Sequence, residues 1–255
     1  MIIGVVHLPP LPGSPRAHDI EEVVERAVRD ASRLEEGGVD AVLVENYGDA
    51  PYYPDDVPKV TVACMTRVVA EVIESVSVPV GVNVLRNDAL AALSVCAATG
   101  ASFIRVNAYV EAVATDQGVL QPVAHEVQRE LRNLGLDVEV YADVKVKHGR
   151  SLDDRPIEDV ARDAVERGLA DAVIVTGGAT GSAPEPEEVE RVARVVDRVL
   201  VGSGVTPDNV GEFLRRGASG FIVGTYFKRD GVTENPVDVD RVRELVSAAS
   251  RTKGR

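Results

Sequence analysis

The chain has 255 residues, a formal net charge of −13 and 45% hydrophobic residues. Its length is close to the roughly 250 residues of a TIM barrel and is short for two ordinary α/β domains. The acidic balance argues against nucleic acid or an anionic membrane as a partner, because both attract a basic surface. No apolar run approaches the length of a membrane span, so we expect no membrane insertion.

The N-terminal segment lacks a basic region followed by a long apolar one, and it therefore predicts a first strand instead of a signal peptide. The two cysteines, Cys64 and Cys96, fall in apolar helical stretches, which favours buried thiols over a disulfide or metal pair. We expect a cytoplasmic protein. Many Glu and Arg residues with few Cys and Met indicate a thermophile.

Strands and helices are predicted to alternate along the chain, as in a parallel sheet covered by helices. The predicted strands span 2–6, 41–44, 78–84, 103–106, 138–141, 172–175, 199–201 and 221–223. A first helix begins at the capping-box residue Asp19. The other predicted helices span 58–76, 87–99, 122–134, 157–168, 186–197, 207–216 and 238–251. The tyrosine-rich segment 46–57 is long for a strand-to-helix loop and forms either a lid or a surface loop.

A weak internal repeat indicates whether the parallel sheet is open or closed into a barrel. Its four copies, in each of which a helix-ending glycine leads into a strand, span 38–44, 100–106, 168–175 and 217–223. They fall on predicted strands two, four, six and eight, which favours a closed barrel over an open sheet. The sequence therefore predicts a single (β/α)₈ TIM-barrel domain over residues 1–255, and for a barrel of this size we expect a homo-oligomer.

The repeat also predicts which residues reach the active-site end of the barrel, because barrel sites lie at the carboxyl ends of the strands. Aligned by their glycines, the copies end at Glu45, Asn107, Thr176 and Gly224. Side chains alternate along a strand, so Arg105 shares the face of Asn107. A buried arginine needs an acidic partner or an anionic ligand. Arg105 therefore either binds substrate or pairs with Glu45 or Asp143.

Two glycine loops near the C-terminus predict a phosphate site. Residues 201–205 lead to Thr206-Pro207, which is typical of a helix start, and strand eight ends in a second Gly-Thr turn. Glycine lets the backbone approach a ligand, and amides at a helix N-terminus bind phosphate. A further glycine-rich loop, 176–182, follows strand six. The predicted phosphate-binding residues are Gly177, Gly178, Gly202, Ser203, Gly204, Gly224 and Thr225.

The segment after predicted strand five carries candidate catalytic groups. Asp143 and Lys145 are expected to share a face, where a carboxylate and an ammonium can act as base and acid. A desolvated lysine could instead form a Schiff base, and a solvated charge cluster is the structural alternative. His7, at the end of strand one, is either catalytic or a core histidine bonded to a carbonyl.

Neither a metal nor a flavin is indicated by a specific motif. Glu45, Asp143 and His148 could converge as ligands, but close-spaced metal ligands are absent from the sequence, so we predict no metal site. FMN fits the C-terminal loops, because flavin barrels bind the flavin phosphate with loops of this kind.

The opening segment 4–15, GVVHLPPLPGSP, resembles the BtpA/SgcQ family, as do residues 45–47, 143–148, 176–178 and 202–204. The resemblance covers essentially the whole chain and implies a phosphate-binding TIM barrel. Val5-Val6 replaces the expected Met-Ile, a conservative core change. The family takes its name from a photosystem I biogenesis factor, and other members accompany sugar-utilisation genes. The resemblance favours as site residues His7, Glu45, Asn46, Asp143, Lys145 and His148.

We predict an isomerase or lyase acting on a small phosphorylated, sugar- or nucleotide-like substrate, since no dinucleotide fingerprint or nucleophile motif is present. The alternatives are a non-catalytic assembly factor that keeps an anion site, and an FMN-dependent oxidoreductase. The predicted catalytic residues are Asp143, Lys145, His7, Glu45 and His148. The predicted substrate-binding residues are Asn46, Arg105, Asn107 and Thr176.

Overall fold

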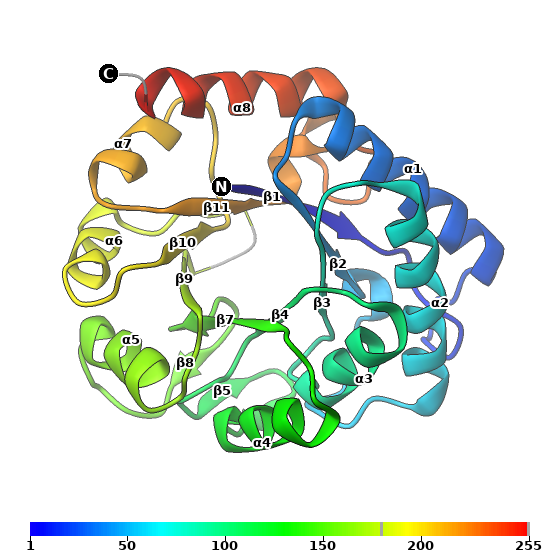
Figure 1. Ribbon diagram of the computed structural model, residues 1–255, viewed down its shortest axis with the longest axis horizontal. Coiled ribbons are helices and arrows are strands. Elements are labelled where there is room, and N and C mark those ends of the chain that lie inside the picture. The colour runs from blue at the N-terminus through cyan, green and yellow to red at the C-terminus, as the bar shows by residue number, and fades with distance from the viewer. Residues whose placement is uncertain (179–180, 254–255) are drawn as a thin grey trace.

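The computed structural model describes residues 1–178 and 181–253. Within these residues, eight parallel strands close into a barrel in which each strand pairs with two neighbours (Figure 1). In order around the barrel they are β1 (Ile2–His7), β2 (Ala41–Glu45), β3 (Val80–Asn83), β4 (Phe103–Val106), β7 (Glu139–Val144), β9 (Ala172–Thr176), β10 (Val199–Gly202) and β11 (Gly220–Val223). The predicted TIM barrel is confirmed.

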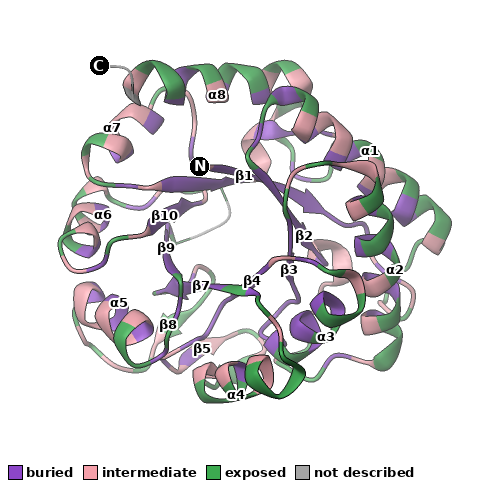
Figure 2. Ribbon diagram, in the orientation of Figure 1, coloured by how far each residue is buried: buried purple, intermediate pink, exposed green. Residues whose placement is uncertain are grey.

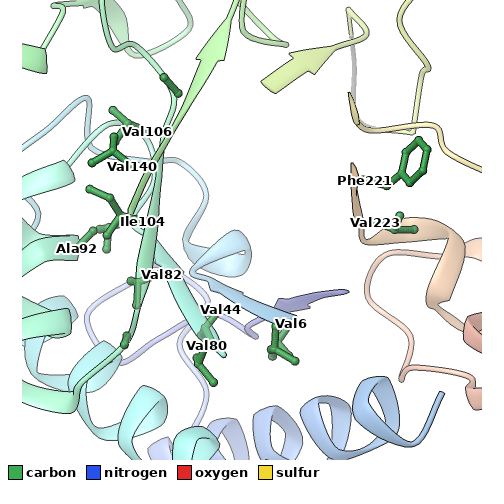
Figure 3. Packing of buried hydrophobic residues seen from close by; sticks show 14 of the residues in the cluster. Val6, Val44, Val80, Val82, Ala92, Ile104, Val106, Val140, Phe221 and Val223 are labelled. Carbon is green, nitrogen blue, oxygen red and sulfur yellow. The ribbon is translucent and has the colours of Figure 1, made fainter. Parts of the chain in front are cut away.

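Helices surround the barrel and connect its strands. They are α1 (Ile20–Gly37), α2 (Lys59–Ser75), α3 (Ala89–Thr99), α4 (Ala124–Leu134), α5 (Ile157–Glu166), α6 (Pro186–Ala193), α7 (Val210–Arg215) and α8 (Val239–Lys253). The barrel strands are buried except for Glu139 at the start of β7, whereas the helices expose their outer faces (Figure 2). Small apolar side chains fill the layer between strands and helices, among them Val44, Val82 and Ala92 (Figure 3). This valine-rich packing explains the apolar strand pattern of the sequence.

The repeated glycine of the sequence ends a helix in a left-handed conformation. Gly38, Gly100 and Gly217 have φ angles of 93°, 82° and 98°, which side chains other than glycine rarely adopt. In the remaining copy, 168–175, the left-handed residue is Leu169, with φ 59°, one position after the glycine. The repeat therefore marks the turn that leads from a helix into the next barrel strand.

The barrel interior has an apolar layer below a polar one. The apolar layer fills the centre, where the rings of Phe103 and Tyr141 stack 5.0 Å apart. Its members are Ile3, Val5, Ala41, Leu43, Phe103, Tyr141, Ala172, Ile174, Leu200 and Ile222. Polar side chains replace these residues at the carboxyl ends of the strands. The barrel is thus a packed core with a polar site at one end.

Two loops after barrel strands form a small antiparallel sheet that was not predicted. It consists of β5 (Val113–Thr115), β6 (Gly118–Leu120) and β8 (Arg150–Ser151). Strands of two or three residues are too short to give a periodic sequence signal. The sheet ties the loop after β4 to the loop after β7, and both loops border the polar end of the barrel.

The segment 46–57 folds over the mouth of the barrel. It contains a short 3₁₀ turn, η1 (Tyr47–Asp49), and the Tyr52 hydroxyl donates to the backbone O of Tyr47 at 2.6 Å. The ring of Tyr47 lies 4.7 Å from that of His7. The segment therefore covers part of the site.

The structure corrects the predicted start of the seventh helix. Residues 207–209 form a turn, and α7 begins only at Val210. The Asn209 side chain causes the delay, since it accepts from Thr206 N and donates to Gly204 O, both at 2.8 Å. Both cysteines are buried and free. Within residues 1–178 and 181–253, no helix is long and apolar enough to span a membrane.

Candidate functional site

The carboxyl ends of the strands bring polar side chains together in one layer. His7 of β1 pairs in register with Glu45 of β2, which pairs with Asn83 of β3. Because side chains alternate, all three project into the barrel. Arg105 of β4 and Asp143 of β7 complete this part of the layer, and all five side chains are buried.

Arg105 and Asp143 form a buried ion pair with two hydrogen bonds. Nε of Arg105 lies 3.1 Å from Oδ1 of Asp143, and its terminal nitrogen lies 3.0 Å from Oδ2. The amide of Asn107 also donates to Oδ2, at 2.7 Å, and Asn83 donates to the Asn107 amide oxygen at 3.2 Å. The structure thus adopts the paired alternative for Arg105. Asp143 lies behind Arg105 and holds it in place, as charged pairs of this geometry do.

Glu45 and His7 face the open part of the site. Glu45 lies 3.8 Å from the Arg105 guanidinium and 3.9 Å from Nε2 of His7, so it makes no short ion pair with either. Burial, followed by the charge of Lys228, holds the pKa of His7 well below its ordinary value, which keeps the ring neutral. No described residue bonds its buried Nδ1 atom. A core histidine bonded to a carbonyl is therefore not what the structure contains.

The lysine that enters the site is Lys147, and the prediction that Lys145 shares the face of Asp143 is wrong. Strand β7 ends at Val144, and Lys145 has a φ of 52°, which breaks the alternation. Its side chain is exposed, while its backbone N–H donates to Glu111 at 2.6 Å. Lys147 instead lies 3.3 Å from the Ser203 hydroxyl. Burial lowers the pKa of Lys147 to about 8.

Two adjoining cavities, of about 190 and 380 Å³, occupy the mouth of the barrel. Glu45, Arg105 and Lys147 line both cavities and so lie between them. The smaller cavity extends under the loops after β10 and β11, and the larger one extends toward the loops after β3 and β4. Pockets that bind small molecules typically measure about 300–1,000 Å³, so the joined space suits a small metabolite.

The smaller cavity contains four of the predicted phosphate-binding residues: Ser203, Gly204, Gly224 and Thr225. Ser203 has a φ of 77°, an unusual conformation for a residue with a side chain and one that is enriched at functional sites. Thr225 begins a 3₁₀ turn, η2 (Thr225–Phe227), directly after Gly224. Backbone amides of loops and turns such as these suit an anion.

The other three predicted phosphate-binding glycines do not line either cavity. A Cβ atom at Gly177 would lie 2.2 Å from the backbone O of Ser182, so this glycine allows its own loop to fold back. The carbonyl of Gly178 accepts from His148 N at 3.2 Å, and Gly202 packs over Ile174. From the loop after β9 it is Gly181 that reaches the cavity. Ala179 and Thr180 of this loop lie outside the described residues.

Gly224 is expected to tolerate no side chain. A Cβ atom there would lie 2.3 Å from Cε1 of His7, so Gly224→Ala must displace the buried ring. Overpacking of this kind costs about 1–3 kcal/mol, which chemical denaturation should detect. The control is Gly178→Ala, whose added methyl meets no atom within 4 Å in the described residues, its chain neighbours aside. Equal unfolding free energies for the two variants would contradict this packing.

Two predicted substrate-binding residues, Asn46 and Thr176, do not line either cavity. The Asn46 side chain donates to Asp49 at 3.0 Å and accepts from Leu85 N at 2.7 Å, which anchors the segment 46–57. Thr176 is buried beneath the site, and its hydroxyl has no hydrogen-bond partner among the described residues. His148 is exposed at the rim of the larger cavity, and burial together with the charge of Lys147 lowers its pKa.

Three site residues were missed from the sequence: Arg86, Lys147 and Arg241. Arg86 follows β3 and is buried against the larger cavity, and its position just after a predicted strand was the available signal. Lys147 follows the predicted Lys145 by two positions. Arg241, on α8, lines the smaller cavity and stacks on the Tyr226 ring at 4.4 Å, and nothing in the helical pattern distinguishes it.

The described residues, 1–178 and 181–253, contain no group of three or more His, Cys, Asp or Glu placed to hold a metal ion. Of the three candidate ligands, Asp143 already accepts hydrogen bonds from Arg105 and Asn107 through its carboxylate. Glu45 lies inside the barrel, and His148 lies on its rim.

Comparisons with known proteins place the chain in a family. A model of the BtpA family matches residues 1–251. An uncharacterised protein of Thermococcus kodakarensis is 47% identical, over 99% of this chain and 96% of its own length. The photosystem I biogenesis protein BtpA of Synechocystis sp. is 43% identical, over 97% of this chain and 87% of its own.

Solved structures resemble the chain in fold. The N-(5'-phosphoribosyl)anthranilate isomerase from Pyrococcus furiosus has a TM-score of 0.61 and 17% identity, over 98% of this chain and 99% of its own. The thiamine phosphate pyrophosphorylase from the same organism has a TM-score of 0.60 and 15% identity, over 98% and 96%. At such identities the likeness concerns the barrel alone, whereas the sequence relatives are close enough to establish kinship. The chain belongs to the BtpA family.

Proposed function

We propose that this protein is an enzyme that binds a small phosphorylated substrate and moves a proton on it, as an isomerase or a lyase does. The observation that carries the proposal is the joined cavity, which has the loops after β10 and β11 on one side and a buried carboxylate with a half-buried lysine in its middle. Phosphate would lie at Ser203, Gly204, Gly224 and Thr225. The reacting carbons would then lie near Glu45.

Glu45 and Lys147 have complementary roles in this proposal. The Glu45 carboxylate would take a proton from a carbon next to a carbonyl group, and the electron pair would move onto the carbonyl oxygen. The Lys147 ammonium and the Arg105 guanidinium would stabilise that oxygen, as preorganised charges do in dry sites. In an isomerisation the proton would return to the former carbonyl carbon, while the hydroxyl proton of the deprotonated carbon moves to the former carbonyl oxygen and a new carbonyl forms there. In an elimination the carbonyl would re-form instead, and the leaving group would depart with its electron pair from the carbon on the other side of the deprotonated one.

Exchange of hydrogen for deuterium tests the proposal for an isomerase and a lyase alike, because both begin with removal of a carbon-bound proton. Sugar phosphates incubated with the protein in D₂O are followed by ¹H NMR, with thermal shift as the binding measurement. We expect at least one substrate to bind and to lose a carbon-bound proton signal. Glu45→Gln should abolish the exchange, whereas the exposed Glu36→Gln should not. If no sugar phosphate binds or exchanges, the proposed function is wrong.

One observation favours a second candidate, an assembly factor that binds an anion without turning it over. The Synechocystis relative, 43% identical, bears the name photosystem I biogenesis protein. A Synechocystis strain without that relative distinguishes the two candidates if the wild-type chain restores growth. Equal rescue by Glu45→Gln favours the binding function, and loss of rescue favours catalysis.

A further inference from the structure

The mouth of the barrel carries more positive than negative charge, although the chain as a whole is strongly acidic. Among the described residues, the cationic side chains that line the cavities are Arg86, Arg105, Lys147 and Arg241. Two buried carboxylates, Glu45 and Asp143, lie among them, and Asp116 lies exposed on the rim. One guanidinium, that of Arg105, is neutralised by the two-bond pair with Asp143. The remaining cations exceed the remaining carboxylates.

Arg86 has no acidic partner of its own. Its side chain is 4% exposed, and it donates one hydrogen bond, to the backbone O of Lys147. No carboxylate of the described residues lies within 4.0 Å of its guanidinium. A buried guanidinium without a counterion is costly, so this arrangement suits a site whose counterion is the ligand. Arg86 lines the larger cavity.

Arg241 lines the smaller cavity, as Arg86 lines the larger one. Its Nε donates to the backbone O of Tyr226 at 2.6 Å, and the ring of Tyr226 lies against its guanidinium. These contacts fix the side chain and leave its terminal nitrogens without an ion-pair partner in the described part of the chain. Planar guanidinium groups held in this way suit phosphate and carboxylate.

The barrel topology places the two ends of the site opposite each other. Arg86 follows β3, and the loop with Ser203 and Gly204 follows β10. In the closed barrel β3 and β10 are four strands apart in both directions. A ligand that contacts both must therefore extend across the whole mouth and pass Glu45, Arg105 and Lys147 on its way.

We infer that the substrate carries two anionic groups, a phosphate held by the loops after β10 and β11 with Arg241, and a second phosphate or a carboxylate held by Arg86. This inference rests on the proposed function and adds the substrate class to it. The second anion would remain at Arg86 while the carbons between the two groups react beside Glu45.

Three matched ligands test the inference by calorimetric titration: sorbitol 6-phosphate, 6-phosphogluconate and sorbitol 1,6-bisphosphate. They share a six-carbon chain and one phosphate, and they differ in the group at the other end. We expect one of the two doubly anionic ligands to bind at least about tenfold more tightly than sorbitol 6-phosphate. The tighter of the two identifies the second anion as a carboxylate or a phosphate.

Variants assign each anion to its arginine. Arg86→Met should remove the gain from the second anion and change the affinity for sorbitol 6-phosphate little, while Arg241→Met should weaken all three ligands. Arg86→Lys, which keeps the charge, should retain part of the gain, and Arg29→Met on the exposed face of α1 is the control. If sorbitol 6-phosphate binds as tightly as the other two, the inference is wrong while the proposed function stands. If none of the three binds, both are wrong.

Discussion

Lys147→Met is expected to lower kcat/KM by about 10²–10³-fold, the usual effect of removing one group that stabilises a developing oxyanion. The matched control is Lys145→Met, which changes the same residue type two positions away and should alter kcat/KM less than about twofold. The two lysines share a sequence motif, but Lys145 is exposed whereas Lys147 lines both cavities. The readout is the exchange or turnover of the sugar phosphate identified in D₂O.

The pH dependence gives an independent measure of the same residue. Because burial lowers the pKa of Lys147 to about 8, its ammonium form is lost as the pH rises through that value. If the ammonium stabilises the substrate oxygen, kcat/KM should fall above about pH 8. Lys147→Arg stays charged at that pH and should remove the decline, at a lower maximum. An unchanged profile in Lys147→Arg would contradict the role of this lysine.

The difference between Lys145 and Lys147 shows where prediction from the sequence stops. Strict alternation along a strand predicts Glu45 and Arg105 correctly as inward side chains, because β2 and β4 remain regular there. After Val144 the backbone turns into a left-handed residue, and alternation no longer decides which side chain faces inward. Which lysine enters depends on that turn, and the turn has no glycine to reveal it.

The fold, unlike the choice between the two lysines, does not depend on any single turn and was therefore predictable. Its signals, apolar strands and helix-ending glycines, recur in every part of the chain, so errors at single residues do not change the result. Arg86 and Arg241 belong to the site through long-range packing. Arg86 follows β3, a strand that carries no copy of the repeat, and Arg241 lies on α8, far in sequence from the first strands of the barrel. A periodic pattern carries no information about such contacts.

Removal of one partner of a fully buried ion pair is expected to destabilise the fold strongly. Asp30 of α1 and Lys228, just after η2, are both 0% exposed and 2.8 Å apart, and Asp30 also accepts from Val237 N at 2.9 Å. Asp30→Ala should therefore lower the free energy of unfolding by about 3–5 kcal/mol, since it leaves a buried ammonium without a counterion. Chemical denaturation provides the measurement.

For comparison, the chain contains an exposed ion pair with the same nitrogen–oxygen distance. Glu36 and Arg243 also lie 2.8 Å apart and also join α1 to the C-terminal part of the chain, but both side chains are more than half exposed. Glu36→Ala should cost less than about 1 kcal/mol, because water already screens this pair. Similar losses in Asp30→Ala and Glu36→Ala would show that burial does not decide the strength of the first pair.

A double variant separates the buried charge from the packing around it. In Asp30→Asn with Lys228→Met neither charge remains, and the asparagine oxygen can still accept from Val237 N. We expect this variant to recover more than half of the stability lost in Asp30→Ala, because the main cost there is the unpaired ammonium. Neither Asp30 nor Lys228 lines the cavities, so the double variant should also bind sugar phosphates as the wild type does. Recovered stability with lost binding would mean that the pair positions the phosphate turn through its charges.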